Sequence, residues 1–214
     1  ASGLYIILTP TFNVIYPRLS ALVATHETEK IIELYRSGTR LFLAVLFPIA
    51  ISVAVFSEEI FIFWTNDLQL AKKSAPICSL LLIGTALNGA MHFPYALQLA
   101  FGKTQIPFII TLVLIVILVP MIFYFTLSYG ALGGGLSWFF LNCFYLLFGT
   151  WLTHRYILKG IALHWLIRDV GVPFFICLII ILVGKNLIYI EGNYLKINLF
   201  LFSFSKVLLD AIKN

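Results

Sequence analysis

Charge is what this sequence has least of. Asp, Glu, Lys and Arg together make up 11% of its 214 residues, whereas hydrophobic residues make up 61%. A soluble domain has about 25% charged residues and about 45–50% apolar residues. Because too few polar side chains are present to cover a soluble surface, the excess apolar surface must face lipid. The composition therefore predicts a membrane protein and excludes an ordinary soluble fold.

Catalytic and metal-binding motifs are also absent. The sequence contains no Ser/His/Asp set, HExxH, P-loop or GxGxxG pattern. The cysteines Cys78, Cys143 and Cys177 each lie in an apolar run without CxxC or Cys/His spacing, which is typical of buried, unreactive thiols. The adjacent acids Glu58 and Glu59 point about 100° apart on a helix and so form no acid/base pair. We therefore expect no enzyme active site, no cofactor and no metal.

Stretches without charge divide the chain into candidate membrane spans. A span needs about 20 apolar residues, and continuous apolar runs favour helices over barrel strands, which alternate. The sequence predicts an all-α, polytopic membrane helix bundle over residues 1–190, followed at 191–214 by a weak final span or an interfacial helix. Because the chain begins inside an apolar run, we expect it to be cut from a larger protein. The predicted spans are 2–24, 41–64, 75–101, 106–127, 131–153 and 171–190.

Lysine and arginine are distributed unevenly between the two ends of these spans. If the basic loops at 25–40 and 154–170 share a side, that side is the richer in cations, and the positive-inside rule makes it cytoplasmic. The richer side holds Arg18, Lys30, Arg36, Arg40, Lys103, Arg155, Lys159, Arg168, Lys206 and Lys213, and the other holds Lys72, Lys73, Lys185 and Lys196. The net charge of +5 is dispersed, which suggests contact with anionic membrane lipids and not with nucleic acid.

Several polar side chains lie inside the predicted spans, where each needs a partner. Such residues either line an aqueous cavity or form hydrogen bonds between helices. Asn88 and His92 are four residues apart and so share a helix face, and Pro94 loosens the segment behind them. The polar residues within spans are Asn13, Arg18, Asn88, His92, Gln98 and Asn142.

Two arginines, Arg18 and Arg40, stand at the ends of adjacent spans on either side of the first basic loop. They either anchor the spans at the cytoplasmic surface or capture a phosphate-bearing head group, because the guanidinium fork matches phosphate oxygens. The small residues of 133–135, all glycine, open the fifth span, and we expect them to let two helices approach closely.

A series of short helix-end patterns follows along the chain in a particular order. The patterns are Tyr16–Ser20, His26–Tyr35, Phe47-Pro48, Phe56–Ile60, Phe63–Asn66, Ala75–Ile77, Leu82–Asn88, Pro94–Ala100 with Gly102, and Tyr129–Gly133. Over about residues 1–175, their order and spacing resemble the C-terminal half of Wzx-type polysaccharide biosynthesis (O-antigen) flippases. These flippases belong to the MOP exporter superfamily, which also contains the MATE drug exporters.

This resemblance implies one lobe of a MATE-like, two-lobed carrier that rocks around a central cavity. The implied substrate is an undecaprenyl-diphosphate-linked oligosaccharide, moved across the bacterial inner membrane for cell-surface polysaccharide such as lipopolysaccharide. The implied partners are this substrate, membrane lipids, the N-terminal lobe and a coupling proton or sodium ion. The candidate residues for substrate binding or cavity lining are Asn13, Arg18, Arg40, Asn88, His92 and Gln98.

Two other functions remain compatible with the sequence. A cation-coupled drug exporter of the MATE type would need an acidic residue deep in a span, and we find none, since Glu58 and Glu59 lie near a helix end. A membrane enzyme that handles glycans would need reactive groups gathered at the membrane face. The loop predicted at 154–170 has such groups, but without a recognisable spacing. They are His154, Arg155, Lys159, His164, Arg168 and Asp169.

Overall fold

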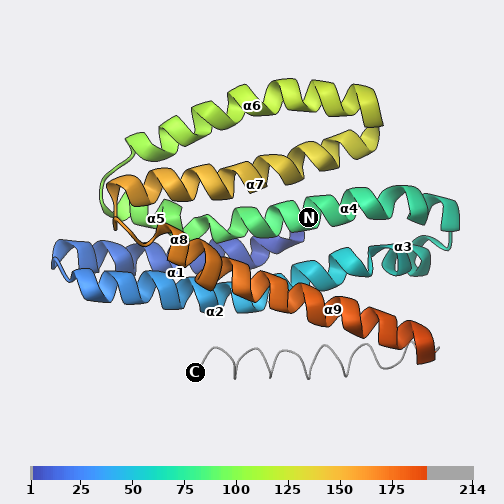
Figure 1. Cartoon of the computed structure of the whole chain (residues 1–214), viewed down its shortest axis with the longest axis horizontal. Helices are drawn as coiled ribbons and strands as arrows, with labels where there is room; N and C mark the ends of the chain where they lie inside the picture. Colours follow the sequence, from blue (N-terminus) through green and yellow to red (C-terminus); the bar gives the residue numbers. More distant parts are fainter. Residues whose placement is uncertain (1, 192–214) are drawn as a thin grey trace.

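The computed structural model describes residues 2–191, and every regular element within them is helical (Figure 1). The prediction of an all-α bundle is therefore confirmed. The elements are η1 (Ser2–Leu4), α1 (Tyr5–Ala24), α2 (Thr28–Val55), α3 (Ser57–Thr65), α4 (Leu68–Ala90), α5 (His92–Ala100), α6 (Gln105–Tyr129), α7 (Ala131–Tyr156), α8 (Ala162–His164), the π-helical segment η2 (Trp165–Gly171) and α9 (Val172–Glu191). The final span or interfacial helix predicted after residue 191 lies outside the described residues.

Five helical stretches are long and apolar enough to cross a membrane. They are Thr28–Val55, Leu68–Ala100, Gln105–Tyr129, Ala131–Tyr156 and Ala162–Leu187. Each overlaps one of the predicted spans, and the chain is a membrane protein. The first predicted span, 2–24, forms the helix α1, which is not among the five. That α1 crosses the membrane stays a prediction.

Two segments predicted as loops are largely helical, so that part of the prediction was wrong. The helix α2 begins at Thr28, and residues 28–40 of the first basic loop form its opening turns. Residues 162–170 of the second basic loop belong to α8 and η2. A charge-free run marks only the part of a helix inside hydrocarbon. The 28 residues of α2 extend about 42 Å, whereas the hydrocarbon core is about 30 Å thick, so charged turns project beyond it.

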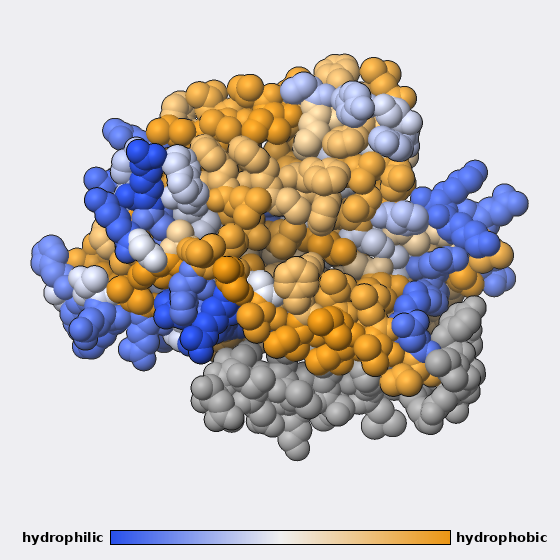
Figure 2. Space-filling view, viewed as in Figure 1, coloured by the Kyte–Doolittle hydropathy of each residue, from blue (hydrophilic) through white to orange (hydrophobic). Residues whose placement is uncertain are grey.

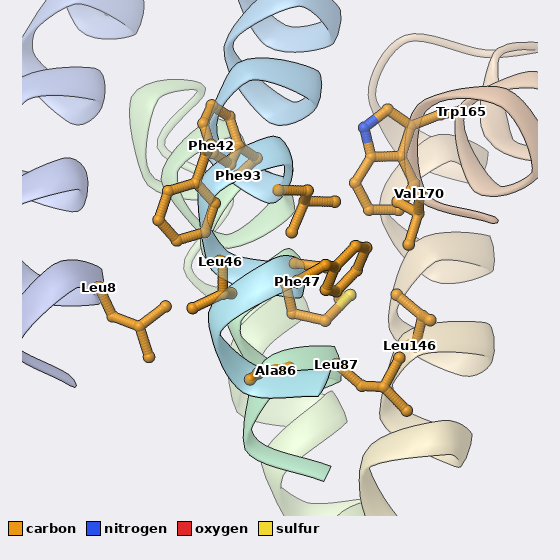
Figure 3. Packing of buried hydrophobic residues seen from close by; sticks show 14 of the residues in the cluster. Leu8, Phe42, Leu46, Phe47, Ala86, Leu87, Phe93, Leu146, Trp165 and Val170 are labelled. Carbon is orange, nitrogen blue, oxygen red and sulfur yellow. The ribbon is translucent and has the colours of Figure 1, made fainter. Parts of the chain in front are cut away.

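The helix α2 is the centre of the bundle. It packs against α1, α4 and α9, while α7 lies between α4 and α6. Leu46 and Phe47 of α2 meet Leu87 of α4, Leu146 of α7 and Trp165 of η2 in one buried cluster (Figure 3). Because lipid is as apolar as these side chains, close contact between them stabilises the bundle more than exclusion of water does.

The outer surface consists of two polar ends separated by an apolar belt (Figure 2). Only 11% of the most apolar part of α6 is buried, which makes this helix the outermost part of the belt. The connections α1–α2, α5–α6 and α7–α8 lie together at one end, and α3–α4 and α6–α7 at the other (Figure 1). We call the first the basic end. Its cations are Arg18, Lys30, Arg36, Arg40, Lys103, Arg155, Lys159 and Arg168.

At the opposite end, a side chain of α9 closes the break between α2 and α3. The break at Phe56 leaves carbonyl groups at the end of α2 without a helical partner. The ammonium Nζ of Lys185 donates to the Val55 carbonyl oxygen at 2.7 Å and pairs with Glu59 Oε1 at 2.8 Å. Lys185 therefore links the C-terminal half of α9 to the junction between α2 and α3.

The close approach of α6 and α7 provides a test of the packing at Gly133. A Cβ atom at this position would overlap the backbone carbonyl of Phe125 in α6, which cannot rotate away. We expect Gly133→Ala to force the two helices apart and to lower the free energy of unfolding by about 1–3 kcal/mol, as overpacking does. Equilibrium unfolding of the detergent-solubilised protein measures the loss.

The neighbouring glycine is the matched control for this substitution. Gly134 has nothing within 4 Å of the position where a Cβ would stand. Because alanine favours a helix over glycine by up to about 1 kcal/mol, Gly134→Ala should leave stability unchanged or raise it. Equal losses in the two variants would contradict the assigned contact.

Candidate functional site

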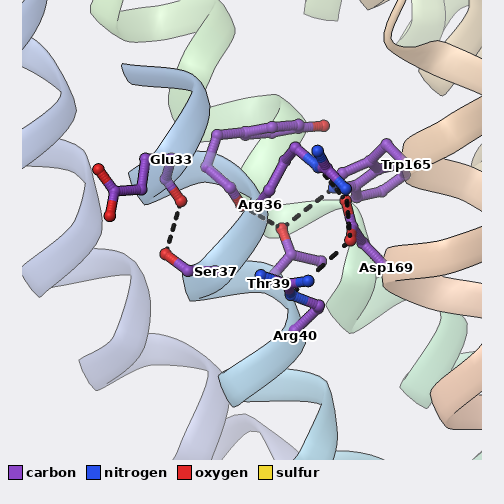
Figure 4. Close-up of polar contacts among 8 residues, drawn as sticks. Glu33, Arg36, Ser37, Thr39, Arg40, Trp165 and Asp169 are labelled. Atoms are coloured by element: carbon purple, nitrogen blue, oxygen red, sulfur yellow. Dashed lines mark hydrogen bonds and ion pairs between the residues drawn. The ribbon is translucent and has the colours of Figure 1, made fainter. Parts of the chain in front are cut away.

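A fully buried carboxylate, Asp169 of η2, lies at the basic end and faces two arginines of α2 (Figure 4). Arg36 Nε donates to Asp169 Oδ2 at 2.8 Å, and Arg36 Nη2 donates to Oδ1 at 3.4 Å. Arg40 Nε lies 3.8 Å from Oδ1, which is close enough for an ion pair. The side chains of Arg36 and Arg40 are 27% and 35% exposed, so each extends from the surface to a charge that has no solvent contact.

Helical spacing brings these groups together. Arg36 and Arg40 are four residues apart on α2 and so point the same way, toward η2. Trp165 and Asp169 are four residues apart on η2, and both are completely buried. Because η2 is π-helical, it is an uncommon segment of a kind that is frequent at functional positions.

Aromatic side chains shield this ion pair from water. Trp165 Nε1 donates to Thr39 Oγ1 at 3.1 Å, and the Thr39 hydroxyl donates to the Tyr35 carbonyl oxygen at 2.6 Å. The Tyr35 ring stacks on Trp165 with 5.6 Å between ring centroids, and His154 of α7 packs against both rings. In such weakly polar surroundings opposite charges attract strongly, and a charge that loses its partner is costly.

Two surface hollows flank the opening turns of α2. The α1 hollow, of about 470 Å³, lies between α1 and α2, and the η2 hollow, of about 560 Å³, lies between α2 and η2. Both contain cations and glutamates, so neither is uniformly positive. The α1 hollow is lined by Arg18, Ala21, Leu22, Lys30, Glu33, Leu34 and Ser37, and the η2 hollow by Glu29, Ile32, Glu33, Arg36, Ser37, Arg40 and Arg168.

The cations of the hollows differ in how far their charge is already compensated. Lys30 pairs with Glu27, and the hydrogen bonds from Lys30 and from the Thr25 hydroxyl lower the pKa of the Glu27 carboxyl. The two arginines described above share the buried carboxylate. Arg18 and Arg168 have no ion-pair partner within residues 2–191. They are therefore the guanidinium groups best able to bind an external anion.

The residues predicted from the sequence do not converge on one site. Arg18 lines the α1 hollow and Arg40 the η2 hollow, so α2 separates them. Asn13 is exposed halfway along α1. The remaining three, in α4 and α5, contact other helices.

Hydrogen bonds between helices account for two of these three. Asn88 Nδ2 donates to Asn142 Oδ1 at 2.8 Å and so joins α4 to α7. Gln98, which is buried, donates to Thr153 Oγ1 at 2.6 Å and joins α5 to α7. His92 instead packs edge-on against an aromatic ring of α1, with 6.3 Å between centroids. Because Asn88 and His92 meet different helices, their contacts favour interhelical packing over a shared cavity lining.

Sequence reasoning missed the central ion pair. It assigned Asp169 to a loop, whereas Asp169 is buried near the start of the apolar stretch Ala162–Leu187. The four-residue spacing of Arg36 with Arg40, and of Trp165 with Asp169, is a signal that could have revealed it. Composition alone does not show whether a polar residue at the end of a span faces solvent or another helix.

Breaking the ion pair should destabilise the protein. Arg36→Gln would leave the buried Asp169 with only Arg40, at 3.8 Å. We expect a loss of about 3 kcal/mol in the free energy of unfolding, because removing one partner exposes the full cost of a buried charge. Removing both partners, by Arg36→Gln with Asp169→Asn, should cost less than the sum of the single losses. A double-mutant cycle measured by equilibrium unfolding tests this.

The surface pair of Lys30 with Glu27 is the control for charge removal at the same end. Both side chains are accessible to solvent, and such pairs contribute little. Lys30→Gln should therefore leave stability unchanged within error. Strictly additive losses for Arg36→Gln and Asp169→Asn would show that the two groups do not act as a pair.

No protein-family model, curated protein or solved structure matches this chain. Within the part of the chain that the structure describes, no three His, Cys, Asp or Glu side chains gather as metal ligands would. A function must therefore be argued from the apolar bundle and from the arginines at its basic end.

Proposed function

We propose that this chain is part of a membrane carrier, not an enzyme, and that it moves a lipid with an anionic, diphosphate-bearing head group. The observation that carries the proposal is the pair of cation-containing hollows at one end of an otherwise apolar bundle. A head group of this kind cannot enter hydrocarbon unaided, since transfer of an unpaired charge is prohibitively costly. Cations at the membrane surface can receive it while the lipid tail stays in the bilayer.

The arginines of the hollows suit this task. A guanidinium group donates two parallel hydrogen bonds to phosphate oxygens and keeps its charge at every physiological pH. Arg18 has no ion-pair partner among the described residues, and Arg40 lies at 3.8 Å from the carboxylate it shares with Arg36. Arg18 and Arg40 are thus free, or only loosely held, to bind a diphosphate from either side of α2.

The resemblance to Wzx-type flippases suggests which lipid is transported and across which membrane. On this proposal the substrate is an undecaprenyl-diphosphate-linked oligosaccharide for cell-surface polysaccharide, and the basic end faces the cytoplasm of a bacterial inner membrane. A second lobe would complete the central cavity, and a proton or sodium gradient would drive the movement. The excess of Lys and Arg at one end supports this orientation.

One observation favours a second candidate, a cation-coupled drug exporter. Asp169 is a buried carboxylate near one end of an apolar helical stretch, and such an exporter needs a carboxylate inside a span. However, its charge is already compensated by Arg36 at 2.8 Å, with Arg40 nearby. A carboxylate between two guanidinium groups is a poor cation site, so the flippase remains the better proposal.

The proposal predicts that the arginines of the hollows are needed for glycan export. In cells carrying the full-length protein, Arg18→Gln should reduce surface glycan about tenfold, because a charge-assisted hydrogen bond to the substrate contributes about 1.5–3 kcal/mol. Arg18→Gln with Arg40→Gln should abolish it, and the lipid-linked intermediate should accumulate. Surface glycan and the intermediate are measured by labelling and extraction, with protein abundance checked by immunoblot.

Two exposed lysines at the opposite end serve as the control. Lys72→Gln with Lys73→Gln removes two charges far from the hollows and should leave glycan export unchanged. Normal surface glycan in the double arginine variant would overturn the proposal. A change in drug susceptibility, with glycan unaffected, would favour the exporter instead.

A further inference from the structure

An apolar groove runs along the molecule between α7 and the η2–α9 stretch. Its volume is about 600 Å³, and side chains such as Phe139 and Leu147 of α7, Ile167 of η2, and Phe175 and Ile179 of α9 line it. The groove exists because α7 packs against α4 and α6, whereas α9 packs against α2 and runs obliquely across the bundle (Figure 1). The two helices therefore diverge and leave an apolar surface between them.

The groove is long enough to span the hydrocarbon of one leaflet of a bilayer. From Leu166 to Ile179, the first and last groove residues of this stretch, the chain advances thirteen residues, which is about 20 Å at 1.5 Å per helical residue. Half of the hydrocarbon core is about 15 Å. Because η2 lies at the basic end and α9 extends toward the opposite end, the groove begins at the membrane surface and ends near the bilayer centre.

An unpaired cation of the η2 hollow stands next in the chain to a residue that lines the groove. Arg168 is exposed and has no ion-pair partner among residues 2–191. The residues on either side of it have other roles, since Ile167 lines the groove and Asp169 forms an ion pair with Arg36 of α2. A guanidinium group one residue away from the lining of an apolar channel, in the adjoining η2 hollow, complements a lipid that has an anionic head group and a hydrocarbon chain.

We propose that this groove is a binding site for an anionic phospholipid of the leaflet at the basic end. One acyl chain lies in the groove between α7 and α9, and the phosphate group binds Arg168. The site faces outward from the α7–α9 side of the bundle and does not depend on any transported substrate. It goes beyond the carrier proposal, in which Arg18 and Arg40 bind the transported lipid, although Arg168 also lines the η2 hollow.

Photochemical labelling of the full chain tests the site. The protein is reconstituted in nanodiscs that contain phosphatidylglycerol with a diazirine in one acyl chain, and the labelled peptides are mapped by mass spectrometry. Label should concentrate on residues 139–147 and 172–179. Phosphatidylcholine with the same chain should label these peptides about fivefold less, because one arginine near the surface contributes about 1 kcal/mol toward an anionic lipid.

Three variants separate the two parts of the site. Arg168→Gln should abolish the preference for phosphatidylglycerol, and Leu147→Trp, at an exposed groove position, should reduce labelling by both lipids. Lys159→Gln removes a cation from the same end outside the groove and should change neither.

Two results would overturn the proposal. In one, both lipids label the wild-type groove equally. In the other, the lipid-exposed face of α6 is labelled as strongly as the groove, which would indicate unspecific contact with bulk lipid. Neither result bears on glycan export, so failure of this inference is distinguishable from failure of the proposed function.

Discussion

The ion pair between Arg36 and Asp169 determines how the basic end is built. It holds η2 against α2 at a place without water, where an unpaired carboxylate would be too costly to keep. Because Asp169 must point inward, its neighbour Arg168 is left on the surface. The same contact sets the direction in which α9 leaves η2, and that direction opens the groove beside α7. The η2 hollow and the groove thus both depend on one buried contact.

A second ion pair holds the other end of the stretch from η2 to α9. Lys185 of α9 pairs with Glu59 of α3, just as Asp169 of η2 pairs with Arg36 of α2. The stretch from η2 to α9 is therefore attached to the α2–α3 pair at both ends, with apolar contacts such as that of Phe174 with Phe47 between them. In lipid, where apolar side chains have little preference for one another, such charged and hydrogen-bonded contacts specify which helices are neighbours.

The remaining polar side chains of the interior serve the same purpose on α7. Asn88 and Gln98 bond to side chains of α7, and Trp138 of α7 donates to Thr85 of α4. These bonds lie along one helix and join it to α4 and α5. Polar residues within the spans thus act mainly as contacts between helices, and the groups available to ligands are concentrated at the basic end.

The sequence by itself determined the all-α membrane class, the approximate position of the long helices and the unequal charge of the two ends. These features follow from composition and from the length of apolar runs, which depend on the solvent and not on neighbouring helices. Only the tertiary structure decided the partners of the polar residues. Asn88 and His92 share a spacing but face different helices, and Asp169 belongs to a buried ion pair and not to a loop. Whether a polar group near a span end meets water, lipid or another helix depends on packing between segments more than one hundred residues apart, such as Arg36 and Asp169, and no local pattern encodes that packing.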